Sequence, residues 1–355
     1  MPCFLVGCAQ SEPPINPKKD LSFNHDLGVD DLSGADLAGT DGGDMAPSGG
    51  DMARPWADRS FATAQDLFSL WSNGSGLVVA AGTSSTLLKS AAGGAFAADT
   101  SSKPAGTANL LALSATGAGP PATPLYVAGA NGTLWSYSGN LAASTGTWAV
   151  ENPNTTNSLY GVWVASDGVA FAVGNQVARK KSGASWATLT GIDASAYNVW
   201  GLKNAAGYVV YAVGYDSGTT AGRIWKSTGG NFTSETSGVN EALNGIYGFS
   251  ETDVYAVGGH GSILHSTGNG VWTKQTAPTA ITTNMIPLEA VGGASADEVY
   301  IAGDGDTVLH KYGAASTTWV QDALPNANPA RYFLAVWANA SEVYIAGSMG
   351  AIFKK

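Results

Sequence analysis

Side chains that could bind a polar ligand lie in three loops that occupy the same place in successive sequence repeats. They comprise a phenol, three carboxylates, a guanidinium and an imidazole: Tyr215, Asp216 and Arg223 in the first loop, His260 in the second, and Asp304 and Asp306 in the third. Such groups form hydrogen bonds and ion pairs. Binding residues concentrate in loops on rigid scaffolds, so this set, the polar arc, is the candidate ligand-binding site. Solvated turn chemistry would also explain each residue separately.

A second polar series occupies one position in every repeat. Its members are Lys89, Ser136, Lys180, Lys226, His265, His310 and Lys354. A metal site would need His265 and His310 to converge with further ligands, but equivalent positions in neighbouring repeats should lie one repeat apart. We therefore expect each of these side chains to satisfy a nearby carbonyl group or an acid such as Asp253, Glu298 or Glu342. We expect neither a metal nor a cofactor.

The repeats themselves consist of a phrase of about forty-four residues that occurs seven times. Its clearest copies are DVYAVGGHGSILH at 253–265, EVYIAGDGDTVLH at 298–310 and EVYIAGSMGAIFK at 342–354. All seven copies share one glycine, found at Gly82, Gly129, Gly174, Gly214, Gly258, Gly303 and Gly347. A fixed period of this size indicates a repeat architecture.

Each repeat has the pattern of short β-strands. Apolar residues alternate with small or polar ones between Gly, Asn, Ser and Asp clusters, and helical spacing is absent. In the fifth repeat the pattern predicts strands at 243–249, 253–258, 262–266 and 270–275. Four antiparallel strands in a unit of this length are typical of a propeller blade, so the chain is predicted to be an all-β, seven-bladed β-propeller.

The two ends of the chain are predicted to meet in one blade. Six repeats carry an aromatic residue in the fourth strand, but the last repeat stops at Lys355 after its third strand. Trp56, which precedes the first repeat, supplies the missing aromatic residue. We expect the segment 55–60 to pair with 351–354 and complete the seventh blade, because closure removes an exposed sheet edge.

The front of the chain has a different composition. Leu5-Val6-Gly7-Cys8 resembles the lipobox of bacterial lipoproteins, in which the cysteine is acylated, so residues 1–8 are expected to be part of a signal peptide and Cys8 a lipidation site. Residues 9–54 are rich in Asp, Gly, Ser and Pro and are expected to form a disordered linker. It resembles the linkers of myxobacterial lipoproteins. The propeller is expected at 55–355.

Charge and apolar content exclude several classes of partner. The formal net charge is −10, which argues against nucleic acid and anionic membranes as partners of the propeller. No run of eighteen apolar residues occurs, so contact with a membrane is expected only through the lipid anchor. Both cysteines, Cys3 and Cys8, precede the propeller. We expect a monomer in the cell envelope, as an outer-membrane lipoprotein or, alternatively, a secreted protein.

The phrase at 254–272, VYAVGGHGSILHSTGNGVW, resembles the BNR and YVTN-like propeller repeats of bacterial envelope proteins and the related Asp-box hairpins of sialidases. The resemblance spans 56–355. A sialidase-type glycosidase would need three arginines that clamp a carboxylate. The available arginines, Arg59, Arg179, Arg223 and Arg331, occupy unlike repeat positions, and the Asp-box aspartate is missing, so the resemblance implies the fold more than this activity.

The sequence therefore favours a noncatalytic, surface-anchored propeller that binds a protein or a glycan. Binding is expected on the face that carries the hairpins between second and third strands. The alternative is a multivalent lectin, in which each gap between blades holds a sugar against one of the recurring aromatic rings. Packing is the more typical role of aromatic residues that recur in every blade.

Overall fold

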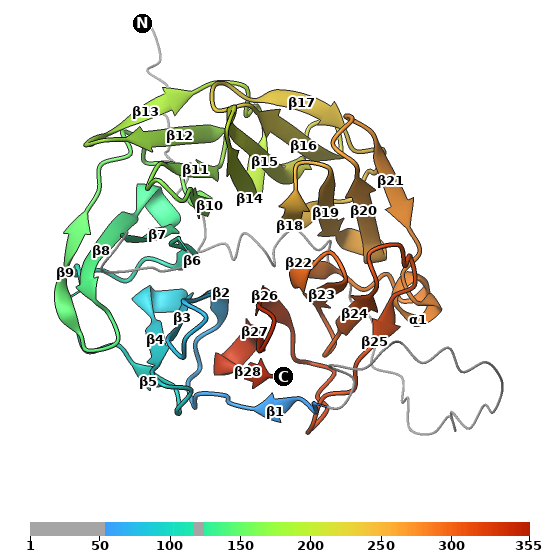
Figure 1. Cartoon of the computed structure of the whole chain (residues 1–355), viewed down its shortest axis with the longest axis horizontal. Coiled ribbons are helices and arrows are strands. Elements are labelled where there is room, and N and C mark those ends of the chain that lie inside the picture. Colours follow the sequence, from blue (N-terminus) through green and yellow to red (C-terminus); the bar gives the residue numbers. More distant parts are fainter. Residues whose placement is uncertain (1–53, 102, 117–123) are drawn as a thin grey trace, which may run out of the picture.

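The computed structural model describes residues 54–101, 103–116 and 124–355, which form seven four-stranded antiparallel sheets. The sheets surround a common axis, with the first strand of each sheet nearest the axis and the fourth on the outside (Figure 1). The chain is thus a seven-bladed β-propeller, as predicted. The expected lipobox and nearly all of the expected linker lie outside the described residues. No described helix is long and apolar enough to cross a membrane.

Six blades consist of consecutive strands. Blades 1 and 2 comprise β2 (Leu67–Ser72), β3 (Val78–Gly82), β4 (Leu87–Ser90) and β5 (Ala97–Ala98), then β6 (Leu110–Ser114), β7 (Leu125–Gly129), β8 (Leu134–Asn140) and β9 (Thr145–Val150). Blades 3 and 4 comprise β10 (Leu159–Val164), β11 (Ala170–Gly174), β12 (Val177–Ser182) and β13 (Ser185–Leu189), then β14 (Ser195–Asn204), β15 (Gly207–Asp216), β16 (Ala221–Ser227) and β17 (Thr233–Thr236).

Blades 5 and 6 comprise β18 (Leu243–Ser250), β19 (Asp253–Gly258), β20 (Ser262–Ser266) and β21 (Trp272–Gln275), then β22 (Leu288–Ser295), β23 (Glu298–Gly303), β24 (Val308–Tyr312) and β25 (Val320–Gln321). Blade 7 comprises β26 (Phe333–Ala338), β27 (Val343–Gly347), β28 (Ile352–Lys354) and, from the other end of the chain, β1 (Ala57–Asp58). The helix α1 (Thr279–Thr283) lies in the crossover from blade 5 to blade 6.

The hydrophobic core lies between blades, because each sheet has both faces covered by its neighbours. The second strands are buried along nearly their whole length, as in β3, β7, β11 and β27. Most core clusters combine residues from two adjacent blades; one of them packs Tyr126 of β7 against Trp186 of β13. Neither blade could bury these residues alone, which explains why the repeats must stack into a closed ring.

The glycine shared by all seven repeats is the last residue of the second strand in six blades and lies two residues before its end in blade 4. At this point the crossover into the same blade passes very close. A Cβ atom added at Gly258 would lie 2.0 Å from the carbonyl oxygen of Ala242, and at Gly82 the distance to the carbonyl oxygen of Asp66 would be 1.9 Å. Both glycines have an extended backbone, with φ of −172° and −160°. Glycine is therefore required here because the crossover leaves no room for a Cβ atom, and not because the backbone is left-handed.

The predicted closure of the ring is confirmed. In β1, Ala57 pairs with Lys354 and Asp58 with Phe353, and the Arg59 N–H donates to the Ile352 carbonyl at 2.8 Å. Trp56 is 6% exposed and packs among residues of blades 6 and 7. The N-terminal segment thus provides the outer strand of the blade that ends the chain.

Asp322 connects this closing blade to blade 6. Its carboxylate accepts a hydrogen bond from Trp56 Nε1 at 2.8 Å and lies 3.3 Å from Lys355 Nζ and 2.6 Å from His310 Nδ1. Burial alone would raise the pKa of Asp322, but His310, Trp56 and Lys355 outweigh it and hold the pKa below its ordinary value. Ionised Asp322 therefore stabilises the contact that closes the ring.

Similar indole hydrogen bonds link other blades. Trp186 and Trp272 lie in outer strands, and Trp319 directly precedes one. Their indole groups donate to the preceding blade's Glu151, Glu235 and Gln275 at 3.1, 2.8 and 2.8 Å. Each of these acceptors lies three residues after its own blade's outer aromatic residue, as does Asp322. Blade 4 has Phe232 in place of the tryptophan, and Leu189 occupies the acceptor position of blade 3. The outer aromatic residues therefore pack and also hydrogen bond between blades.

Candidate functional site

The polar arc lies on three consecutive blades and on the face that carries the crossovers. Tyr215 and Asp216 end β15 and Arg223 lies on β16, His260 lies in the β19–β20 hairpin, and Asp304 and Asp306 lie in the β23–β24 hairpin. Hairpins and crossovers are bonded together on this hairpin face; for example, the Met349 N–H donates to Asp66 Oδ1 at 3.0 Å. The sequence thus placed the six residues on a common face of a rigid scaffold.

Arg223 and Asp306 each form an ion pair with a residue outside the polar arc. Arg223 Nη2 contacts both Asp193 oxygens, at 2.9 and 2.7 Å, and Trp225 Nε1 donates to the same carboxylate at 3.0 Å. Burial would raise the pKa of Asp193, but the bonds from Trp225 and Arg223 outweigh it and lower the pKa. Arg223 therefore secures the crossover from blade 3 to blade 4.

Asp306 has an equivalent role between blades 6 and 7. Its Oδ2 accepts hydrogen bonds from Arg331 Nη2 at 2.7 Å and from the Asn328 backbone N–H at 2.5 Å, while Oδ1 accepts from Arg331 Nε. The Arg331 guanidinium also lies over the Phe353 ring at 4.4 Å. Both charged side chains are almost completely buried. This pair holds the crossover against the ring and is not available to a ligand.

The remaining members of the arc are Tyr215, Asp216, His260 and Asp304. Asp216 shapes its own hairpin: Thr219 Oγ1 donates to Oδ2 at 2.8 Å, and this bond is the main reason that the pKa of Asp216 is lowered. His260 is exposed at φ = 53°, and Tyr215 and Asp304 are half-buried. His260 is therefore the most exposed member of the arc, and Tyr215 and Asp304 are partly exposed on the neighbouring blades.

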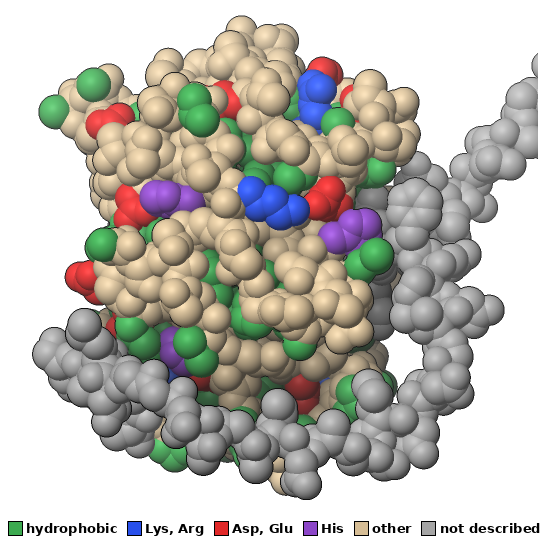
Figure 2. Space-filling view, turned by 90° about the vertical axis from the view of Figure 1, so that its right-hand side faces the viewer, with side chains coloured by type: hydrophobic (Ala, Val, Ile, Leu, Met, Phe, Trp, Pro, Cys, Tyr) green, Lys and Arg blue, Asp and Glu red, His purple; other side chains and the backbone are tan. Residues whose placement is uncertain are grey.

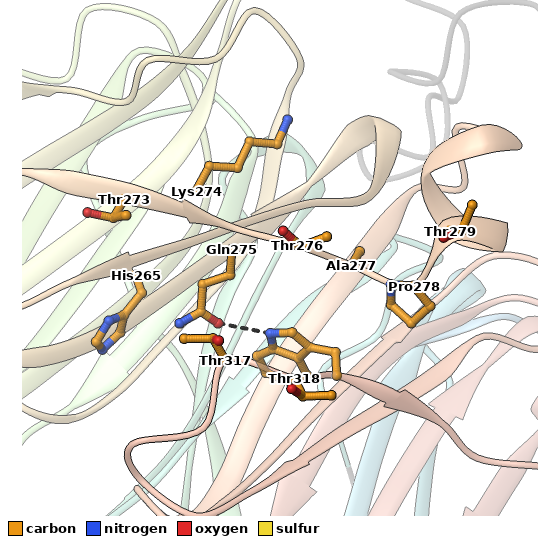
Figure 3. Close-up of a pocket in the computed structure, with 11 residues that line it drawn as sticks. His265, Thr273, Lys274, Gln275, Thr276, Ala277, Pro278, Thr279, Thr317 and Thr318 are labelled. Carbon is orange, nitrogen blue, oxygen red and sulfur yellow. Dashed lines mark hydrogen bonds between the residues drawn. The ribbon is translucent and has the colours of Figure 1, made fainter. Parts of the chain in front are cut away.

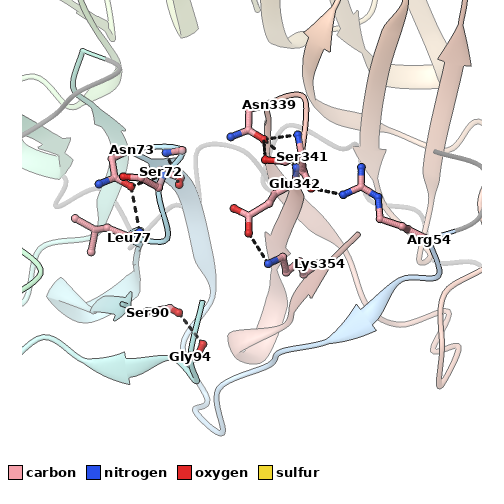
Figure 4. Close-up of polar contacts among 12 residues, drawn as sticks. Arg54, Ser72, Asn73, Leu77, Ser90, Gly94, Asn339, Ser341, Glu342 and Lys354 are labelled. Carbon is pink, nitrogen blue, oxygen red and sulfur yellow. Dashed lines mark hydrogen bonds and ion pairs between the residues drawn. The ribbon is translucent and has the colours of Figure 1, made fainter. Parts of the chain in front are cut away.

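The third-strand polar series behaves as expected from the sequence. His265 pairs with Asp253 at 2.7 Å, Lys354 pairs with Glu342 at 2.5 Å, and Lys180 donates to the Gly229 carbonyl at 2.8 Å. Figure 4 shows the Glu342–Lys354 pair beside the turns that Asn73 and Asn339 hold in blades 1 and 7. Within the described ranges no three metal-ligating side chains converge.

The arginines are dispersed among separate ion pairs and carbonyl contacts. Arg179 donates to the carbonyls of Pro153 and Asn154 at 2.6 and 3.0 Å, Arg223 is bound to Asp193, and Arg331 to Asp306. These three guanidinium groups lie on blade 3, on blade 4 and in the crossover to blade 7. A clamp that requires three arginines at one carboxylate is not assembled from them.

Two features of the site region were missed by the sequence reasoning. The first is a groove of about 690 Å³ between the outer strands of blades 5 and 6. It is lined by residues of 273–279 and 317–319, five of them threonines, together with His265 (Figure 3). Gln275 accepts the Trp319 indole hydrogen bond and its amide nitrogen points toward Thr317 (Figure 3). The cluster of threonines and the long crossover were the available sequence signals.

The lining of this groove is mostly uncharged, with Lys274 and His265 as its ionisable side chains. In Figure 2 the described side chains of this side show scattered charges and histidines among uncharged polar surface, without a broad patch of one sign. The Trp319 ring that ends the groove is only 5% exposed. The groove therefore offers hydroxyl and amide groups and little aromatic surface.

The second missed feature is a bulge in every first strand. The pairing of first and second strands shifts at the same place in all seven blades. The extra residues are Phe68, Leu111, Tyr160, Tyr197, Asn244, Glu289 and Leu334. Members from four blades contact one another, so these side chains converge at the axis. Burial, with the nearby Tyr160 hydroxyl, raises the pKa of Tyr197.

No protein-family model and no curated protein matches this chain. Solved propellers are similar in structure. YCF48 bound to D1 peptide superposes with a TM-score of 0.66 at 14% identity, covering 85% of this chain and 96% of that one. A catalytically inactive virginiamycin B lyase from Staphylococcus aureus with quinupristin gives 0.67 at 11%, covering 84% and 98%. The WD40 propeller of Doa1 gives 0.66 at 10%, covering 84% and 96%. At these identities the likeness shows the fold alone.

Proposed function

We propose that this propeller is a noncatalytic binding protein that captures a protein ligand on its hairpin face. The observation that carries the proposal is the bonding of these hairpins to the crossovers: the Gly259 N–H donates to the Ala242 carbonyl at 2.9 Å, and the Asp304 N–H to the Pro287 carbonyl at 3.1 Å. This bonding presents Tyr215, His260 and Asp304 on neighbouring blades. A pre-ordered surface loses little conformational freedom on binding. YCF48, a structural neighbour, was solved with a bound peptide, which is consistent with a protein ligand for this fold.

A multivalent lectin is the weaker alternative. Sugar stacking in every gap between blades would need exposed ring faces, but Trp186, Phe232, Trp272 and Trp319 are between 4% and 8% exposed. One gap, the threonine-lined groove between blades 5 and 6, has the hydroxyl and amide groups suited to a single glycan. A glycan array would separate the two: several equivalent sites per chain would support the multivalent lectin.

The test of the hairpin face uses a triple variant, Tyr215→Ala with His260→Ala and Asp304→Ala. The partner is first identified by affinity capture from the cells that produce the protein, and its binding to the purified chain is then measured by calorimetry. We expect the triple variant to bind at least tenfold more weakly. The control changes Lys203, Asn204 and Asn269 to Ala, on turns of the opposite face. Equal binding by both variants would contradict the proposal.

Anchoring through Cys8 forms a separate part of the proposal and lies outside the described residues. It is supported by the motif Leu5-Val6-Gly7-Cys8 and by the acidic, Gly-rich segment that follows. An acylated Cys8 would hold the propeller at the cell envelope. Labelling with a fatty-acid analogue should mark the wild-type chain and the Cys3→Ser variant, whereas the Cys8→Ser variant should remain unlabelled. Labelling of both variants would exclude this anchor.

A further inference from the structure

The outer strand of blade 2 differs from the other outer strands in length and composition. β9 has six residues, whereas β5, β25 and β1 have two each, and β17 and β21 carry the charged residues Glu235 and Lys274. β13 is uncharged but one residue shorter. No charge occurs between Ser144 and Val150, and Val150 is 73% exposed. Natural edge strands are normally shortened or charged to prevent pairing, and β9 is neither.

One side of β9 has backbone groups that no described strand pairs with. β9 is the last strand of its sheet and lies on the outside of the ring (Figure 1). The Glu151 N–H donates to the Leu134 carbonyl at 2.9 Å, which sets the alternation of the ladder with β8. By that alternation Ala149 and Thr147 bond to β8, while the N–H and C=O groups of Gly146, Trp148 and Val150 point outward.

We propose that this edge pairs with β9 of a second copy of the chain, giving a two-fold symmetric dimer. An antiparallel arrangement centred on Trp148 places Gly146 opposite the partner's Val150. All outward groups then gain partners, in about six backbone hydrogen bonds. The exposed Val150 side chain meets a glycine, which leaves room for it.

The absence of charge on β9 favours a second copy of this acidic chain as the partner that pairs with it. The net charge of the chain is −10, of which residues 54–355 carry −3. Two copies of this acidic chain repel each other, so contact is least costly where the surface carries no charge. β9 meets this requirement on both sides of a symmetric contact, and salt should strengthen the dimer because it screens the remaining repulsion. A dimer would replace the monomer expected from the sequence.

Sedimentation velocity of the full chain over a range of concentrations tests the proposal. We expect concentration-dependent dimerisation that becomes stronger between 50 and 500 mM salt (about a threefold change in Debye length). Ala149→Lys should weaken self-association at least tenfold, because a lysine on the edge blocks pairing. Ala187→Lys is the matched control, since Ala187 is exposed and follows Trp186 as Ala149 follows Trp148. It should dimerise like wild type.

A peptide competitor separates strand pairing from other contacts. The capped peptide of residues 144–150 should dissociate the dimer, and methylation of its Gly146, Trp148 and Val150 nitrogens should abolish that effect. Methylation at Thr145, Thr147 and Ala149 should not. A monomer at all concentrations, or equal loss in Ala149→Lys and Ala187→Lys with unchanged circular dichroism, would overturn the proposal. Peptide binding to a chain that stays monomeric would also overturn it and assign the edge to a different protein.

Discussion

The shared glycine of the repeat can be tested by adding a single methyl group. Gly258→Ala should lower the free energy of unfolding by about 3 kcal/mol, because the new Cβ would overlap the Ala242 carbonyl and main chain must shift on both sides. Gly230→Ala is the control: no atom lies within 4 Å of its added Cβ, so stability should be unchanged or slightly higher. Urea unfolding measures both. Equal effects would refute the close-approach explanation.

At the residue scale, the sequence predicted on which face of the propeller the polar residues lie, but not which residues they form ion pairs with. The polar arc was found from the hairpins alone, since the repeat places every hairpin on the same face. The acid that pairs with Arg223 and the arginine that pairs with Asp306 lie in crossovers, which share no periodic pattern. Asp193 and Arg331 therefore could not be assigned as the partners of Arg223 and Asp306 before the structure.

At the element scale, ring closure by β1 can be tested with one short deletion. Removal of residues 55–60 deletes β1 and the buried Trp56, and loss of a buried tryptophan typically costs about 3 to 5 kcal/mol. We expect a strong fall in the melting temperature, measured by calorimetry. A deletion of the same length at residues 45–50 is the control and should leave the melting temperature unchanged. A similar melting temperature for both deletions would refute closure by β1.

The repeat pattern predicted the packing role of the outer aromatic residues but not the bulges in the first strands. The recurrence of Trp or Phe predicted packing between blades, and the structure adds the indole hydrogen bond to Glu151, Glu235, Gln275 or Asp322. The bulges were not predicted, because they depend on the register between two strands. Asn244 and Glu289 within otherwise apolar first strands were their sequence signal.

At the scale of the whole molecule, acid should weaken the closure of the ring through Asp322. Its pKa in the folded chain lies below the ordinary value, so its stabilising contribution is present at neutral pH and is lost as pH falls through the folded pKa. Asp322→Asn should therefore be about 3 to 5 kcal/mol less stable than wild type at pH 7, because the buried Lys355 ammonium loses its counter-charge.

The difference between wild type and Asp322→Asn should shrink as pH falls below the ordinary aspartate pKa of about 3.9. Urea unfolding across this pH range provides the measurement. Glu235→Gln is the control, because its amide can still accept the Trp272 indole hydrogen bond, as Gln275 does for Trp319. It should cost about 1 kcal/mol at most. A difference that stays constant with pH would contradict the role of the Asp322 charge.

Because β1 is the first described strand, any mechanical load carried by the N-terminal segment acts first on blade 7, where β1 closes the ring. A pull would act on two ladder residues and on the Trp56 ring before it reached any blade made of consecutive strands. A force applied through this end would therefore be resisted chiefly by the Trp56 indole, which packs between blades 6 and 7. The residues that close the ring, Trp56 and β1, would thus also carry the mechanical load.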